Sequence, residues 1–151
     1  MLLFFPVGPP VGAVFGAPML RLCLGDSTVV VTVEIAANPA TRQKGLMLRK
    51  SLEESSGMLF LYQSVQPVSQ GFWMYQVQFP LDIAFISADN KIVSITQMEP
   101  CLSSDPKSCP AYYSEKPYKS ALEVNAGFFA AAGIEVGDKV RYAVDGKCEH
   151  Q

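Results

Sequence analysis

The chain has 151 residues and a mass of 16.4 kDa, the size of one ordinary domain, which excludes a multidomain arrangement. Hydrophobic residues make up 49% and charged residues 17% of the sequence, which excludes a disordered chain and is sufficient for a packed core. Twelve basic residues against fourteen acidic ones give a net charge of -2. The basic excess that phosphate contacts require is therefore missing, and nucleic acid is not an expected partner.

The first twenty residues carry no charged side chain and are rich in Leu, Val and Phe. Prolines and glycines interrupt this stretch repeatedly, which excludes a stable transmembrane helix of about 20 residues. Gly16 and Ala17 offer small residues for cleavage, so residues 1–20 resemble a secretory signal peptide, the alternative being an irregular tail. We therefore expect a single β-rich domain over residues 21–151, in a periplasmic or secreted location.

Hydrophobic alternation predicts a first strand over residues 28–36, with every second residue from Val29 to Ile35 on one face. Asn38 followed by proline is typical of a helix start, and Gly45 is suited to end a helix of about two turns. Four more strands are predicted over residues 57–62, 72–77, 81–86 and 91–98. The turn between the last two of these strands predicts a hairpin.

Residues 100–118 contain four prolines, which predicts a long loop, and long loops in compact domains are commonly functional or pinned. Asn125 is expected to cap a second short helix that ends at Gly133, and a last strand is predicted over residues 139–144. Short strands dominate. The sequence thus predicts a mainly β fold, a β-sandwich or a partly open barrel, with two short helices.

Four cysteines occur, none at the two-residue spacing of zinc or redox pairs, and the one histidine, His150, lies next to the C-terminus. We therefore expect no metal site and no cofactor. Cys101 and Cys109 bracket the proline-rich loop, and a bond between them would remove roughly 2.6 kcal/mol of chain entropy. Cys23 and Cys148 are expected to form a second disulfide if the terminal strands are neighbours; the alternative is two free thiols.

Because the one histidine lies next to the C-terminus, we do not expect a Ser-His-Asp or Cys-His catalytic arrangement. No glycine-rich phosphate loop follows a predicted strand, so nucleotide binding has no support either. Carboxylates, arginines, tyrosines and one tryptophan remain, and these residue types suit both acid/base chemistry and ligand recognition.

A series of short motifs follows in a fixed order along the chain: Val33-Glu34-Ile35-Ala36, Arg42-Gln43-Lys44-Gly45-Leu46-Met47-Leu48-Arg49, Gly57-Met58-Leu59-Phe60, Phe72-Trp73-Met74, Pro80-Leu81-Asp82-Ile83, Lys91-Ile92-Val93, Ser120-Ala121-Leu122-Glu123-Val124, Ala126-Gly127, Gly133-Ile134 and Gly137-Asp138. Over about residues 28–144 this series resembles the domain of unknown function 192 family. The resemblance implies a compact, mainly β domain of bacteria and archaea, often behind a signal peptide, and brings no established activity. Gln76 and Val77 stand where many members have Asn-Thr, so no polar role is assigned there.

Arg42 and Arg49 are seven positions apart and are able to converge on a carboxylate or phosphate through paired hydrogen bonds. The structural alternative is an ion pair with Asp82 or Glu123. Asp82 alternates with apolar residues, so we expect it to be partly buried, with an arginine or backbone N–H groups as its partner. Glu123 precedes the second predicted helix and is expected to accept hydrogen bonds from the free N–H groups at its start.

Glu34 lies on the less apolar face of the first predicted strand and is expected to point into water. Trp73 occupies a strand whose two faces cannot both belong to one core. Together with the loop residues Tyr112, Tyr113 and Tyr118, it is a candidate stacking surface for a sugar or peptide.

Two functions fit these residues. The first is a noncatalytic extracytoplasmic module whose cleft, lined by Arg42, Arg49, Trp73 and the loop tyrosines, binds a small polar or anionic ligand. The second is a hydrolase or lyase in which Asp82 and Glu123 form an acid/base pair and Arg42 stabilises developing negative charge. A glycosidase-like pair requires carboxyl groups about 5 to 9.5 Å apart in one open cleft, so geometry distinguishes the two functions.

Overall fold

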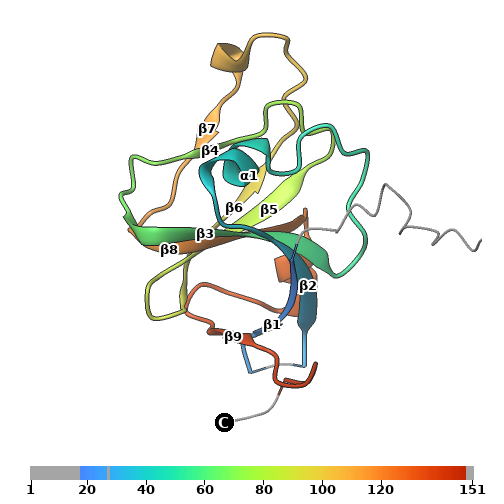
Figure 1. Ribbon diagram of the computed structural model, residues 1–151, viewed down its shortest axis with the longest axis vertical. Helices are drawn as coiled ribbons and strands as arrows, with labels where there is room; N and C mark the ends of the chain where they lie inside the picture. The colour runs from blue at the N-terminus through green and yellow to red at the C-terminus, as the bar shows by residue number, and fades with distance from the viewer. Residues whose placement is uncertain (1–17, 27, 149–151) are drawn as a thin grey trace, which may run out of the picture.

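The computed structural model describes residues 18–26 and 28–148, and a seven-stranded sheet in the order β6-β5-β8-β3-β2-β1-β9 forms the body of the molecule (Figure 1). Its strands are β1 (Met19–Leu24), β2 (Val30–Ala36), β3 (Ser56–Gln66), β5 (Leu81–Ile86), β6 (Ile92–Met98), β8 (Tyr118–Asn125) and β9 (Val140–Tyr142). A separate ribbon and the helical segments are β4 (Phe72–Trp73), β7 (Ala111–Tyr112), α1 (Pro39–Lys44), α2 (Phe128–Ala132) and the short 3-10 helix η1 (Pro106–Ser108). The predicted mainly β fold with two short α-helices is confirmed.

The sheet curls into a half-barrel. Its strands pair antiparallel except β2 and β3, which run parallel. The two sheet edges, β6 and β9, approach each other at one end, where Lys91 and Lys139 form an isolated antiparallel β-bridge through their backbones. There the Val140 N–H donates to the Asn90 carbonyl at 2.8 Å. Of the two predicted architectures, the partly open barrel is therefore the correct one.

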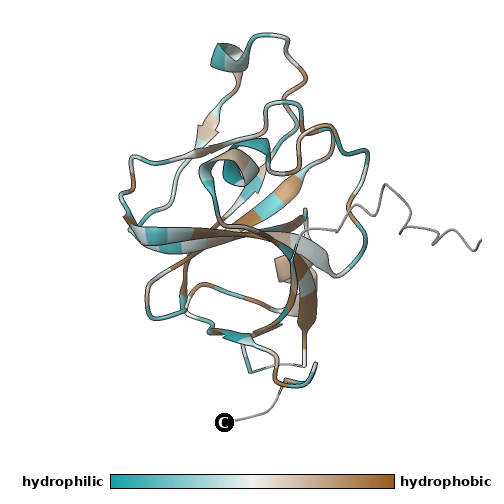
Figure 2. Ribbon diagram, in the orientation of Figure 1, coloured by the Kyte–Doolittle hydropathy of each residue, from teal (hydrophilic) through white to brown (hydrophobic). Residues whose placement is uncertain are grey.

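Each face of the curled sheet has its own hydrophobic core. The inner core lies inside the half-barrel with α2 against it, and its buried members are Leu22, Leu24, Val31, Val33, Leu59, Ala84, Ile86, Ile92, Leu122, Val124, Phe129, Ile134 and Val140. The outer core lies on the other face, beneath α1 and the β4 segment, and its buried members are Ala36, Leu46, Met58, Phe60, Met74, Val77, Leu81, Ile83, Phe85, Met98, Tyr118 and Ala121. In β2 the predicted apolar face packs into the inner core, and Figure 2 shows that this strand is largely hydrophobic.

The first helix forms where the sequence predicts it. The Asn38 side chain accepts a hydrogen bond from the Thr41 N–H at 2.9 Å, and Gly45 ends the helix with φ 46°. The predicted cap of the second helix is wrong. Gly127, with φ 85°, precedes α2, whereas the Asn125 side chain donates to the Leu52 carbonyl at 2.9 Å, because Asn125 still belongs to β8.

Three strands escape the sequence prediction, and one of them, the two-residue β7, lies within the predicted loop 100–118. β8 runs from Tyr118 to Asn125 in the middle of the sheet, between β3 and β5. β1 begins at Met19, within the last residues of the predicted leader, while residues 1–17 lie outside the described part of the chain. The predicted strand over residues 72–77 shortens to β4, because the Val77 N–H turns back to the Met74 carbonyl at 3.0 Å.

Both predicted disulfides are present. Cys23 bonds to Cys148, with Cα atoms 5.6 Å apart, and Cys101 bonds to Cys109, with Cα atoms 5.8 Å apart. Cys23 lies within β1 and Cys148 follows β9; these terminal strands are neighbours, the condition under which the bond was expected. Among the described residues no helix has the length and hydrophobicity needed to cross a membrane.

Candidate functional site

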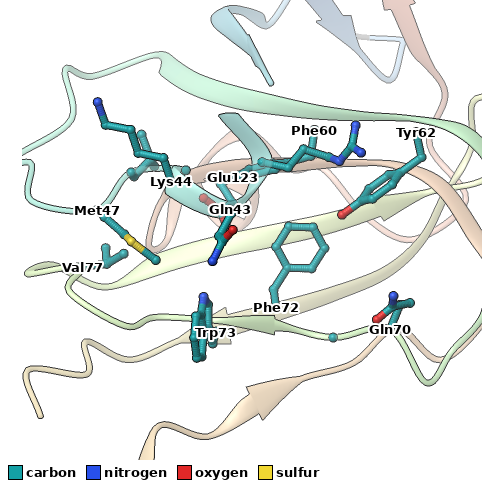
Figure 3. Close-up of a pocket in the computed structure, with 14 residues that line it drawn as sticks. Gln43, Lys44, Met47, Phe60, Tyr62, Gln70, Phe72, Trp73, Val77 and Glu123 are labelled. Carbon is teal, nitrogen blue, oxygen red and sulfur yellow. The ribbon is translucent and has the colours of Figure 1, made fainter. Parts of the chain in front are cut away.

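A cavity of about 520 Å³ opens on the outer face of the sheet, between α1, the adjoining strands β3 and β8, and the β4 segment (Figure 3). The residues after α1 and the helix itself form one wall, and Phe72, Trp73 and Val77 form the facing wall. Phe60, Tyr62 and Glu123 from the sheet form the floor. The cavity thus combines apolar and aromatic surface with a few polar groups.

The α1 wall carries the cations and a polar side chain. Arg42 donates from Nη1 to the Leu61 carbonyl at 2.9 Å, and its guanidinium lies 4.7 Å from the centre of the Tyr62 ring. In Figure 3, Gln43 reaches into the cavity, whereas the Lys44 chain extends toward its rim. This wall therefore presents a fixed guanidinium beside an adjustable amide and ammonium group.

Glu123 is the buried ionisable group of the floor, with 4% of its surface exposed. It lies opposite Met58 in the β3–β8 ladder and opposite Ile83 in the β5–β8 ladder, both residues of the outer core. No hydrogen bond or ion pair joins its carboxyl group to another described residue, and no fully buried side-chain oxygen in that part of the chain lacks a partner. The carboxyl oxygens therefore keep a little surface, on the side of the cavity. Burial raises the pKa of Glu123 to about 8.

The facing wall depends on the proline-rich loop. Trp73 is 38% exposed and pairs through its backbone with Ala111 of β7. The Gln76 N–H donates to the Cys101 carbonyl at 3.0 Å, and Cys101 is held by its bond to Cys109. The short disulfide therefore fixes the strand segment that carries the tryptophan.

Asp82 lies on the opposite face of the sheet from Glu123. In the β5–β8 ladder Asp82 stands opposite Val124, a residue of the inner core, because successive residues of a strand face opposite sides. Asp82 accepts a hydrogen bond from the Gly127 N–H at 2.9 Å. Burial raises the pKa of Asp82, and the N–H groups of Gly127 and Phe129 oppose that rise. Asp82 thus serves the start of the second helix, the role predicted for Glu123, and the two carboxyl groups do not share a cleft.

The two candidate arginines do not converge. Arg49 donates to Glu34 at 2.5 Å and lines a different hollow from Arg42. The predicted pairing of an arginine with Asp82 or Glu123 is wrong, and so is the prediction that Glu34 points freely into water. Glu34 and Arg49 meet because the turn after α1 returns over β2.

The three tyrosines that were predicted on the loop do not line the cavity, and two of them lie in strands, Tyr112 in β7 and Tyr118 in β8. Tyr118 is buried and donates from its hydroxyl to the Gln70 carbonyl at 2.9 Å, so it supports the cavity wall from behind. The Tyr112 hydroxyl accepts from the Glu99 N–H at 3.1 Å, and Tyr113 is 53% exposed. The aromatic residues of the cavity that sequence reasoning missed are Phe60, Tyr62 and Phe72.

The alternation of side chains along β3 indicates which of its aromatic residues face the cavity. Phe60 and Tyr62 share the face opposite to Leu59 and Leu61, which belong to the inner core or pack against it. Within the described part of the chain, no group of three or more His, Cys, Asp or Glu side chains is placed to hold a metal ion.

Crystal structures of two other proteins are among those similar to this chain. A protein from Sinorhizobium meliloti 1021, described as a "putative transcription regulator", is 30% identical with a TM-score of 0.73, covering 83% of this chain and 95% of that chain. A protein of unknown function from Novosphingobium aromaticivorans DSM 12444 is 29% identical with a TM-score of 0.70, covering 90% of this chain and 94% of that chain. No curated protein matches the sequence. Residues 21–142 match the model of DUF192, described as uncharacterized ACR, and the chain therefore belongs to the domain of unknown function 192 family.

Proposed function

We propose that this protein is a noncatalytic extracytoplasmic module that binds a small polar or anionic ligand in the cavity between α1 and β4. The observation that carries the proposal is the floor of that cavity. There, Glu123 is 4% exposed and has no partner among the described residues, beneath a wall that carries Arg42 and Lys44. Buried polar groups are ordinarily hydrogen-bonded, so one that faces a cavity without a partner favours a ligand as the missing partner.

The size and lining of the cavity support a small organic ligand. A volume of about 520 Å³ lies within the range of small-molecule pockets, which are mostly apolar with a few placed polar groups. Arg42, Lys44 and the indole N–H of Trp73 are hydrogen-bond donors only, which favours a ligand with exposed oxygen acceptors. Phe72 and Trp73 offer surface for the apolar or planar part of that ligand.

Two features support an extracytoplasmic location. The bonds Cys23–Cys148 and Cys101–Cys109 involve all four cysteines of the chain, and disulfides persist in oxidising compartments. The composition of residues 1–20 resembles a secretory signal. Export of the full chain, followed by detection of both bonds in protein recovered from the periplasm or medium, tests this part of the proposal.

The second candidate function, a hydrolase or lyase with Asp82 and Glu123 as an acid/base pair, is less well supported. It requires both carboxyl groups in one cleft, and the β5–β8 register directs them to opposite faces.

A thermal-shift screen of small organic anions and polar compounds on the oxidised protein tests the binding function. Ligands are expected to raise the melting temperature of the wild type, because they bind the folded state alone. Gln43→Phe introduces an aromatic ring on the cavity side of α1 and should abolish the shift. Ala40→Phe is the matched control, since Ala40 is exposed on the same helix and does not line the cavity. A shift that survives Gln43→Phe, or its absence for every compound, contradicts the proposal.

A further inference from the structure

We propose that Glu123 takes part in recognition as a carboxylic acid that donates a hydrogen bond from the cavity floor to an anionic oxygen of the ligand. The inference rests on the proposed binding function and deepens it by naming the ligand class. The ligand is a small organic anion whose carboxylate or phosphate oxygen reaches the floor while its body lies against Phe72 and Trp73. Binding of the ligand is then linked to retention of a proton.

The position of Glu123 is fixed by the centre of the sheet. Its backbone lies in β8 with β3 on one side and β5 on the other, which leaves the side chain no route out of the outer face. With 4% of its surface exposed and no partner among the described residues, its carboxyl group can form its next hydrogen bond only across the cavity. Figure 3 places it behind Gln43, at the back of the cavity.

The charged groups around the floor do not compensate a negative charge on Glu123. From α1, Arg42 is committed to the Leu61 carbonyl and the Tyr62 ring, and Lys44 extends toward the rim. Neither cation contributes to the pKa of Glu123, which burial alone raises to about 8. The acid form is therefore the main form of this side chain at neutral pH.

The remaining titratable groups near the floor do not supply a positive charge to Glu123 either. Burial raises the pKa of Tyr62 of β3, Arg42 and Tyr118 oppose that rise, and Glu123 adds to it, so Tyr62 is a neutral phenol. Tyr118, on the same strand as Glu123, is engaged with Gln70, and burial raises its pKa as well. The ionisable residue of β5, Asp82, faces the other side of the sheet. No neighbouring element thus supplies the cation that an ionised Glu123 would need.

An anionic oxygen is the partner that suits this arrangement. A carboxylic acid adds one more donor to a cavity whose guanidinium, ammonium and indole groups only donate. Hydrogen bonds from O–H to a negatively charged oxygen are short and strong, and buried acids kept neutral in apolar sites are known to act as such donors. Arg42 and Lys44, which also line the cavity, would repel a ligand cation.

The proposal predicts a definite pH dependence. Below the pKa of Glu123 the affinity for an anion stays constant, because the donor is already protonated. Above that pKa the floor becomes negative and repels the ligand, so the affinity falls about tenfold for each further pH unit.

Trp73 provides the measurement, since it is the single tryptophan of the chain and lines the cavity. Its fluorescence is followed while benzoate, phenyl phosphate, benzamide and benzylamine are titrated into the oxidised protein between pH 6 and 9.5. At pH 7 at least one of the two anions is expected to bind about tenfold or more tightly than benzamide and benzylamine. Comparison of the two anions shows whether the floor prefers a carboxylate or a phosphate.

Glu123→Gln removes the titratable proton and keeps a hydrogen-bond donor at the same position. The amide keeps an N–H donor of similar shape but does not titrate, so anion affinity at pH 7 should stay within about threefold of the wild type and lose its decline above pH 8. Glu54→Gln is the matched control, because Glu54 is exposed and lies outside the cavity, and it should retain the decline.

Several results would overturn the inference. Tighter binding of benzylamine, with affinity that rises between pH 7 and 9, would show that Glu123 binds cations as a carboxylate while the binding function itself stands. The inference also fails, with the binding function left standing, if anion binding does not weaken above pH 8 or weakens equally in Glu123→Gln, because Glu123 is then not the titrating donor. A carbon NMR titration of Glu123 with a midpoint near the ordinary 4.5 also overturns it. Failure of all four probes to bind at Trp73 contradicts the proposed function and the inference together.

Discussion

The two faces of the sheet treat neighbouring carboxyl groups in opposite ways. On the inner face, Asp82 accepts a hydrogen bond from the Gly127 N–H at the start of α2. On the outer face, Glu123 comes from the adjacent strand and is equally well buried, but it meets a cavity in place of a donor. Burial alone therefore does not distinguish the structural carboxyl group of Asp82 from the carboxyl group that we propose binds a ligand. The partner distinguishes them, and the outer face leaves room for a partner from outside the chain.

The two disulfides stabilise different parts of the molecule. Cys23–Cys148 ties β1 to the segment that follows β9, whereas Cys101–Cys109 holds the loop that supports Trp73. The same type of crosslink thus joins the ends of the domain in one place and supports the cavity wall in the other. Variants that each remove one disulfide or one carboxyl group test whether stability and ligand binding depend on different parts of the molecule.

The largest effect is expected for the double variant Cys23→Ser with Cys148→Ser. The bond spans 125 residues, and its loss should lower the free energy of unfolding by about 5 kcal/mol in the chain-entropy model. Urea denaturation followed by circular dichroism measures the loss. Binding at Trp73 should persist wherever the variant is folded, and a loss below about 1 kcal/mol would show that the β1–β9 pairing does not depend on the bond.

Glu123→Gln should stabilise the protein at neutral pH. The unfolded carboxyl group titrates near 4.5 and the folded one at about 8, so between these values the folded state holds a proton that the unfolded state has lost. Wild-type stability therefore falls as the pH rises from about 4.5 to about 8, with a difference of about 3 kcal/mol reached at pH 7. The variant should gain that amount at pH 7 and nothing at pH 4.

Urea denaturation at both pH values measures this gain, and Glu54→Gln, at an exposed position, should show none. Equal stability of Glu123→Gln and the wild type at pH 7 would mean that the buried carboxyl group has a partner in the folded protein. In that case the contrast between the two faces disappears.

The strands that sequence reasoning located are those with regular alternation and clear turns. The segment from Val30 to Ala36 and the hairpin at residues 81–98 satisfy both conditions. β8 was missed because it is covered on both faces and carries Glu123 among apolar residues, so its pattern lacks a polar face and Pro117 suggests a loop. This error misplaced Glu123 at a helix start.

The candidate site was only partly predictable for the same reason. Arg42 and Trp73 line the cavity, while Arg49 and the loop tyrosines lie elsewhere. Which residues meet depends on the β3–β8 pairing and on the path of the chain around α1, and neither is encoded in local spacing. Once β8 is placed, the alternation of Phe60 and Tyr62 puts them on the face of the sheet that carries Glu123.

The double variant Cys101→Ser with Cys109→Ser should affect the cavity more than the fold. The bond closes a loop with a sequence separation of 8, and its loss should lower the free energy of unfolding by roughly 2.6 kcal/mol at most. Without it, the support of β4 through the Cys101 carbonyl loosens, so acrylamide should quench Trp73 more strongly and ligand affinity should fall. Unchanged quenching and affinity would show that β4 and β7 hold the wall without the bond.

Asp82→Asn is expected to give the smallest effect and the opposite pattern. The carboxyl group faces N–H donors of Gly127 and Phe129, and an amide can accept from one of them but sets its own N–H group against the other. The free energy of unfolding should fall by about 1 kcal/mol, as for other lost hydrogen bonds. Because the side chain lies on the inner face, anion affinity at Trp73 and its decline above pH 8 should remain as in the wild type. A change in that decline would show that the two carboxyl groups are coupled through the sheet. The proposal that Asp82 supports the fold and Glu123 binds the ligand independently of each other would then be wrong.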